Sequence, residues 1–194
     1  MRVLVDTNIL LRSAEPNHSL FRQATQAVSR MLHQNHSVFY CSQNIAEFWN
    51  VATRPADKNG LGLSHEEVLQ EVSSIEGLLT LLPDIPAIYT AWKAIVRDYK
   101  VQGVKVYDAR LVALMNVYAI EAILTFNDAD FKRYSGITAI HPSSSSAGLA
   151  CTIAATYPLS AVLPSHNDAK GTHDLSPGIR LLTVSPYCRI TLRT

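Results

Sequence analysis

The sequence predicts an α/β fold in which helices cover both faces of a mostly parallel sheet. Short aliphatic and β-branched segments alternate along the chain with longer segments whose apolar residues recur at helical spacing. Strands that alternate with helices pair in parallel, because each helix carries the chain back across the sheet. Four acidic residues also lie where predicted strands meet helices, or in the first turns of helices: Asp6, Glu47, Asp108 and Asp130.

The N-terminal half is predicted to contain two strands and three helices. Its strands are apolar runs at 2–5 and 38–41, and its helices carry apolar stripes over about 18–34, 43–53 and 64–77. The segment Asp6-Thr7-Asn8 supplies turn and capping groups after the first strand, and Ser42 is placed to cap the second helix. Ser64 and Glu67 have the spacing of a capping box, which marks the start of the third helix.

The second half continues the alternation as far as Pro142. We expect strands at 78–82, 122–126 and 137–140, and helices at 87–99, 108–118 and 131–134. After Pro142 the composition changes: a run of four serines begins at Ser143, and no sustained helical or alternating pattern follows. We therefore predict a domain over residues 1–142 and an irregular tail over 143–194, of low order or unlike a natural packed sequence.

Composition narrows the class of protein. Hydrophobic residues make up 47% of the chain and charged residues 17%, which is typical of a soluble globular protein. The net charge of +1 gives no broad positive field, so any contact with nucleic acid must be local. Three widely spaced cysteines argue against a disulfide framework and favour the cytoplasm. The apolar N-terminus contains Asp6 and Asn8, so we do not interpret it as a secretion signal, and we expect no membrane span.

The four acids suggest a particular chemistry. Sites in parallel sheets lie at the carboxyl ends of the strands, so these side chains are expected to converge. Clustered carboxylates repel one another unless a cation joins them, and Mg²⁺ prefers oxygen ligands. Glu47 falls well off the apolar stripe of its helix and can face such a site. Each acid taken alone has an ordinary alternative, since an Asp after a strand is often a helix cap and a helical Glu is often solvated.

Five segments resemble a PIN-domain ribonuclease, most closely the VapC type of toxin–antitoxin nuclease. They are VLVDTNILL at 3–11, SQNIAEFWNV at 42–51, GVKVYDARLVALM at 103–115, ILTFNDADF at 123–131 and ITAIHP at 137–142. The resemblance implies a three-layer α/β/α domain that holds Mg²⁺ or Mn²⁺ and cleaves RNA internally. It also implies a homodimer and a cognate antitoxin partner.

The same resemblance assigns roles to the acids. Asp6, Glu47 and Asp108 match the three most regular acids of the family. Asp6 and Asp108 are expected to bind the metal directly, and Glu47 to be a ligand or to orient the attacking water. Asp130 is the favoured fourth acid and is expected to complete the metal site, directly or through water. Asn127 stands where an acid is common in the family, so it is retained as a neutral oxygen donor, and Asp128 is given least weight.

Supporting residues are expected around these acids. Thr7 and Asn8 can hydrogen-bond the Asp6 turn or a phosphate. Basic residues that flank the acidic segments are candidate phosphate contacts, with Arg110 foremost: Arg12, Arg54, Lys58, Lys105 and Arg110.

Two rival functions remain open. A phosphatase with an aspartate nucleophile normally needs a second acid two residues later, where this chain has Asn8. A catalytically weak PIN-like module that binds RNA or protein without cutting is left open by Asn127.

Overall fold

A five-stranded parallel sheet forms the centre of the molecule. The computed structural model describes residues 1–144 and the short segments 182–184 and 188–190. The sheet order is β3-β2-β1-β4-β5, and each neighbouring pair is parallel. Its strands are β1 (Arg2–Val5), β2 (Ser37–Cys41), β3 (Thr80–Leu82), β4 (Ala122–Leu124) and β5 (Thr138–Ile140). The predicted fold class is confirmed.

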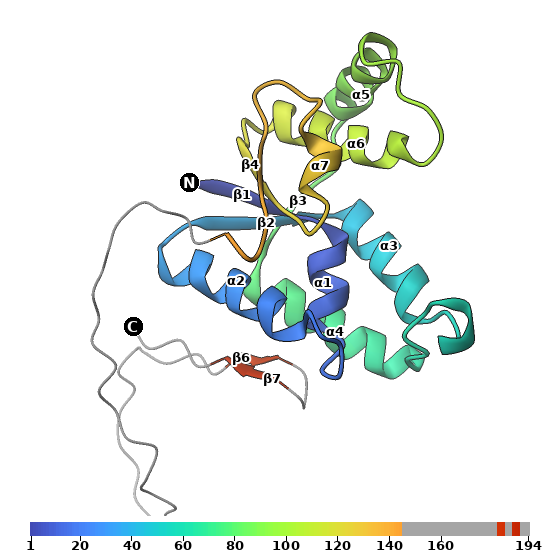
Figure 1. The fold of residues 1–194 in the computed structure, drawn as a ribbon, viewed down its shortest axis with the longest axis vertical. Helices are drawn as coiled ribbons and strands as arrows, with labels where there is room; N and C mark the ends of the chain where they lie inside the picture. The colour runs from blue at the N-terminus through green and yellow to red at the C-terminus, as the bar shows by residue number, and fades with distance from the viewer. Residues whose placement is uncertain (145–181, 185–187, 191–194) are drawn as a thin grey trace, which may run out of the picture.

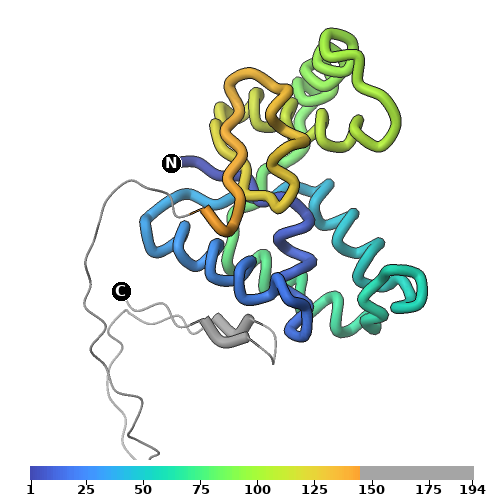
Figure 2. The backbone as a smooth tube through the Cα atoms, in the orientation of Figure 1, coloured from blue at the N-terminus to red at the C-terminus, as the bar shows by residue number. Residues whose placement is uncertain are grey.

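Helices cover both faces of this sheet and make three layers (Figure 1). One face carries α1 (Thr7–Ser13), α2 (Phe21–His33), α3 (Ser42–Ala52) and α4 (His65–Leu78). The other carries α5 (Pro86–Asp98), α6 (Lys105–Val117) and α7 (Asp128–Phe131). The backbone trace shows that α1 and α7, far apart in the sequence, both begin beside the middle of the sheet (Figure 2).

The central strand explains the two apolar cores. Val3 and Val5 pack into the core with α1 to α4, whereas Leu4 packs into the core with α5 and α6. Successive side chains of a strand point to opposite faces, so a strand covered on both sides must be apolar throughout. All three side chains are fully buried, which is why residues 2–5 form a continuous apolar run.

Three local predictions are wrong in informative ways. Residues 7–13 form α1, where only a turn was expected after β1. Ser42 is the first residue of α3 and does not cap it; the side chain of Asn44 instead accepts the Cys41 N–H at 2.9 Å. Helix α6 begins at Lys105, three residues before Asp108, so that Asp108 lies in its first turn. The capping box of Ser64 and Glu67 is confirmed.

Two further features complete the described chain. A short 3-10 helix, Ala56–Lys58 (η1), lies between α3 and α4. The predicted irregular tail falls mostly outside the described residues, apart from the antiparallel pair β6 (Leu182–Val184) and β7 (Cys188–Ile190). The division at residue 142 stays a prediction. None of the described helices has the length and apolar character needed to cross a membrane.

Candidate metal centre

Asp6 lies at the point where the direction of strand order reverses. Strand β1 has β2 on one side and β4 on the other, and the Asp6 N–H donates to Leu124 O at 2.9 Å. Crevices of this kind at the carboxyl ends of strands are the usual ligand sites of open α/β sheets. Asp6 occupies the N-cap position of α1, yet its side chain makes no capping hydrogen bond. Its carboxylate is therefore not used to start the helix.

Two neutral side chains hold one oxygen of Asp6. Asn8 Nδ2 donates to Asp6 Oδ2 at 2.7 Å, and Thr125 Oγ1 donates to the same oxygen at 2.6 Å. The expectation that Asn8 supports the Asp6 turn agrees with this contact. Thr125 was not expected to be a site residue, although a polar residue directly after a buried strand was a usable signal.

Thr125 joins the ends of β1 and β4. Its hydroxyl accepts hydrogen bonds from Asn8 Nδ2 at 3.1 Å and from the Asn127 N–H at 2.9 Å, while its single proton goes to Asp6. The side chain is fully buried, so these partners replace water completely. This arrangement fixes the orientation of the Asp6 carboxylate.

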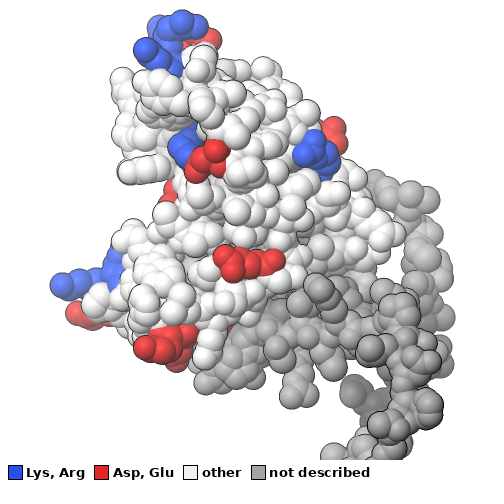
Figure 3. Space-filling view, turned by 180° about the vertical axis from the view of Figure 1, so that it is seen from behind, with Lys and Arg blue, Asp and Glu red and all other residues white. Residues whose placement is uncertain are grey.

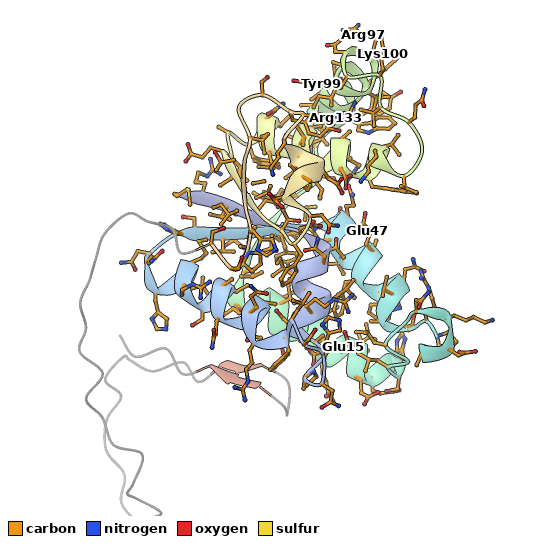
Figure 4. The ribbon with its side chains drawn as sticks, in the orientation of Figure 1. Glu15, Glu47, Arg97, Tyr99, Lys100 and Arg133 are labelled. Carbon is orange, nitrogen blue, oxygen red and sulfur yellow. The ribbon has the colours of Figure 1, made fainter. Side chains whose placement is uncertain are left out.

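Glu47 reaches the same region from α3 (Figure 4). Thr7 Oγ1 donates to its Oε2 at 2.7 Å, and Gln43 Nε2 donates to its Oε1 at 2.8 Å. Thr7 thus supports Glu47, where the sequence suggested the Asp6 turn or a phosphate. Asn44 in turn donates to Thr7 Oγ1 at 3.2 Å. Gln43 and Asn44 were not expected to take part, although Gln43 lies four residues before Glu47 and side chains at that spacing are neighbours on a helix.

The other two acids meet across α6 and α7, where Lys105 lies between them. Lys105 Nζ is 2.6 Å from Asp130 Oδ2 and 3.6 Å from Asp108 Oδ2. Asp128 instead pairs with Lys132 at 3.0 Å. Asn127 is exposed, and its backbone N–H is what contacts Thr125.

Electrostatics couple these carboxyl groups. Burial raises the pKa of Asp6 to about 6, and the negative charges of Asp108 and Glu47 add to that rise, while the Thr125 hydrogen bond opposes it. Burial also raises the pKa of Asp108; Asp130 and Glu47 act in the same direction and Lys105 opposes them. The negative charges of the four acids thus act on one another through Asp6 and Asp108.

The donors fit a hard divalent cation. The two side-chain hydrogen bonds that Asp6 accepts within residues 1–144 both reach Oδ2. Its raised pKa shows that the negative charge there lacks full compensation. Within the described part of the chain, no group of three or more acidic, histidine or cysteine side chains has a geometry that could hold a metal ion. The carboxylate oxygens are nevertheless the type of donor that Mg²⁺ prefers.

Arg110 does not lie free to meet a phosphate. Its Nη2 donates to Asp84 Oδ1 at 2.6 Å and its Nη1 to Gln43 Oε1 at 3.0 Å; Ser42 also donates to Asp84. Because Arg110 takes the oxygen of the Gln43 amide, the amide nitrogen faces Glu47. Arg110 therefore helps to orient Glu47 through Gln43.

Thr125→Val is expected to weaken the fold and to slow the RNA cleavage that the resemblance implies. Valine keeps the shape but removes the donor to Asp6 and leaves two N–H groups without an acceptor, at about 1–3 kcal/mol each. Loss of a residue that orients a metal ligand typically costs about 10–100-fold in metal affinity or activity. Cleavage rates and urea unfolding measure both effects. Thr138→Val, at an exposed position of β5, is the matched control; equal losses in both variants would contradict the assigned role.

Comparison with known families agrees with the geometry. The model of the PIN domain matches residues 3–137, a span that includes all four acids. The chain belongs to the PIN domain family. No curated protein sequence matches it.

Solved structures share the PIN fold at low sequence identity. VapBC-1 from nontypeable Haemophilus influenzae is 14% identical with a TM-score of 0.56, over 74% of this chain and 100% of that one. VapBC2 from Rickettsia felis, bound to a DNA fragment from its promoter, is 14% identical with a TM-score of 0.54, over 73% and 98%. FitAB bound to the IR36 DNA fragment is 16% identical with a TM-score of 0.51, over 72% and 94%. These likenesses establish the three-layer fold of this PIN domain.

Proposed function

We propose that this PIN domain is a divalent-metal-dependent endoribonuclease and the toxin of a toxin–antitoxin pair. One observation carries the proposal. The half-buried carboxylate of Asp6 lies at the switch point of the sheet, where Asn8 and Thr125 donate to its Oδ2. It lies near the negative charges of Asp108 and Glu47, and its pKa is raised to about 6. Such a group is stabilised in its ionised form by a bound cation.

Asp6 and Asp108 are proposed to hold Mg²⁺ or Mn²⁺, with Glu47 as a further ligand or as the base that accepts a proton from water. A divalent ion at such a site lowers the pKa of bound water and neutralises charge on a phosphate. Asp130 adds to the negative charge that favours the ion.

The chain's own residues prepare this site. Thr125 and Asn8 donate to Asp6 Oδ2 and so hold the carboxylate in one orientation. Thr7 and Gln43 each donate to a different oxygen of Glu47, which limits its rotation while each oxygen keeps a lone pair. An orientation set before substrate binds reduces the entropy lost when the reacting groups come together.

RNA is proposed as the substrate, with binding that depends on local contacts. On the face seen in Figure 3, acidic and basic side chains lie in small separate groups, with no broad basic field. The net charge of +1 agrees with that view. A metal ion in the acidic site would then supply much of the attraction for the scissile phosphate.

An antitoxin is the proposed protein partner. The fold is shared with structures described as VapBC complexes. Large apolar side chains are exposed on and around α4 and α5: Leu69, Leu81, Ile85 and Tyr89. Ile85 and Tyr89, at the start of α5, offer apolar contacts to such a partner or to a second copy of the chain, whereas Leu69 lies on α4 at the opposite face of the sheet. A homodimer in the cytoplasm is the proposed assembly.

Removal of the metal is expected to abolish cleavage. Full-length protein incubated with total RNA and Mn²⁺ should generate new 5′ ends that sequencing can map, and chelator should suppress them to the level without enzyme. Readdition of Mn²⁺ in excess of chelator should restore the same ends. If RNA is bound but stays intact under all these conditions, the chain is instead a binding module.

A further inference from the structure

Lys105 forms ion pairs with two of the four acids of the candidate site, Asp108 and Asp130. It lies in the first turn of α6, one turn before Asp108, and so on the same side of that helix. Its Nζ is 2.6 Å from Asp130 on α7. Among the ion pairs of residues 1–144, Lys105 supplies the positive charge paired with any of the four acids. The ammonium group thus ties α6 to α7 across the site.

The two contacts of Lys105 differ in a way that matters for metal binding. The Asp130 contact has the length of a strong charged hydrogen bond, whereas the Asp108 contact is long at 3.6 Å and involves Oδ2. Asp108 therefore keeps Oδ1 for a ligand. Asp130 is engaged by an ammonium group, and a cation bound at about 2.0–2.1 Å from the same carboxylate would meet that positive charge directly.

The charge balance points the same way. Asp6, Glu47, Asp108 and Asp130 carry four negative charges when ionised, and Lys105 carries one positive charge. One divalent ion leaves the group at about −1, while a second would leave it at about +1 beside an immobilised ammonium. Asn127 adds no charge to compensate a second ion. The first ion is therefore attracted by a net charge of about −3, whereas a second would meet only about −1 together with the ammonium group of Lys105.

We propose that Lys105 is a built-in counterion that holds the cation position between Asp108 and Asp130, so that the site takes a single divalent ion. This inference rests on the proposed metal dependence, and it assigns the ion to the side of Asp6, Glu47 and Asp108. Lys105 then replaces a second metal and does not serve as a free phosphate contact.

Metal counting tests the proposal without any measurement of activity. Metal-free full-length protein is titrated with Mn²⁺, and bound ions are counted by electron paramagnetic resonance and calorimetry. Wild type is expected to bind one ion. Lys105→Met keeps much of the aliphatic stem but removes the charge, and it is expected to bind two. Lys132→Met is the matched control, because Lys132 pairs with Asp128 outside the four acids, and it should bind one ion.

The number of bound ions distinguishes the counterion proposal from the proposed metal dependence and from the nuclease function. Two ions in wild type, or one ion in Lys105→Met with unchanged affinity, would overturn the proposal. Lys105→Gln gives a second uncharged side chain if the methionine variant does not fold, and it too should bind two ions. No bound ion in any variant would overturn both this inference and the proposed metal dependence. The predicted counts without RNA cleavage would leave the counterion role standing and overturn only the nuclease function.

Discussion

Asp6→Asn is expected to lower the rate of RNA cleavage at least about 100-fold while leaving the fold intact. Losing a residue that merely orients a metal ligand costs about 10–100-fold, and Asp6 is proposed to be a ligand itself. Asparagine keeps an oxygen that can accept the hydrogen bonds of Asn8 and Thr125, so the packing around residue 6 survives. The negative charge is lost, and the second oxygen is replaced by an amide NH2 group, which cannot bind a cation. Single-turnover cleavage of a mapped RNA site in Mn²⁺ measures the effect.

Asp128→Asn is the matched control for that experiment. Asp128 undergoes the same chemical change, lies on α7 close to Asp130 in sequence, and pairs with Lys132 away from the four acids. Its cleavage rate should stay within about threefold of wild type, as expected for loss of an exposed ion pair. Cleavage by Asp6→Asn at the wild-type rate would end the case for a metal bound at the switch point.

The metal-free protein is expected to become more stable as the pH falls from 7.5 to 5. The pKa of Asp6 is raised from 3.8 to about 6 in the folded protein, chiefly by burial and further by Asp108 and Glu47. A raised folded-state pKa means that the folded protein binds the proton more tightly than the unfolded chain. The stabilisation is therefore fully present below about pH 3.8 and is lost as the pH rises through about 6.

The size of this effect can be measured against a variant. At 1.36 kcal/mol per pKa unit the full contribution is about 3 kcal/mol, of which about 1.4 kcal/mol appears between pH 7.5 and pH 5. Urea unfolding in chelator should show this gain in wild type, and Asp6→Asn should lack that part of it because asparagine does not titrate. An identical pH dependence in both proteins would show that Asp6 is not strained by burial. Mn²⁺ at pH 7.5 should stabilise wild type more than the variant.

The two expected results have the same physical cause. A buried carboxylate that is difficult to ionise weakens the empty fold, and a bound cation recovers that free energy. Fold stability and metal binding are therefore expected to rise and fall together in this protein.

The sequence predicted the architecture well because its signals are local or periodic. Residues 2–5 are apolar throughout since β1 is covered on both sides, and Ser64 with Glu67 marks a helix start through contacts within one turn. The prediction failed where a start signal is weak: α1 follows Asp6 with no side-chain cap, and α6 begins at Lys105 before the more conspicuous Asp108.

The roles of polar residues were less accessible from sequence. Thr7 supports Glu47, and Arg110 reaches Asp84 and Gln43, partners that are 26 and 67 residues away in the chain. No spacing rule connects such residues, because they meet only after the sheet has placed several helices side by side.

The amino-acid sequence by itself determined the alternation of strands and helices, and it placed four acids directly after strands or in the first turns of helices, since both depend on patterns within a few residues. Only the tertiary structure decided which oxygens of those acids are occupied and where a lysine lies among them. Hydrogen bonds and ion pairs form over about 3 Å, and that precision arises when β1 and β4 pair and α6 packs beside α7. Thr125 on Asp6 and Lys105 on Asp130 are both products of that assembly.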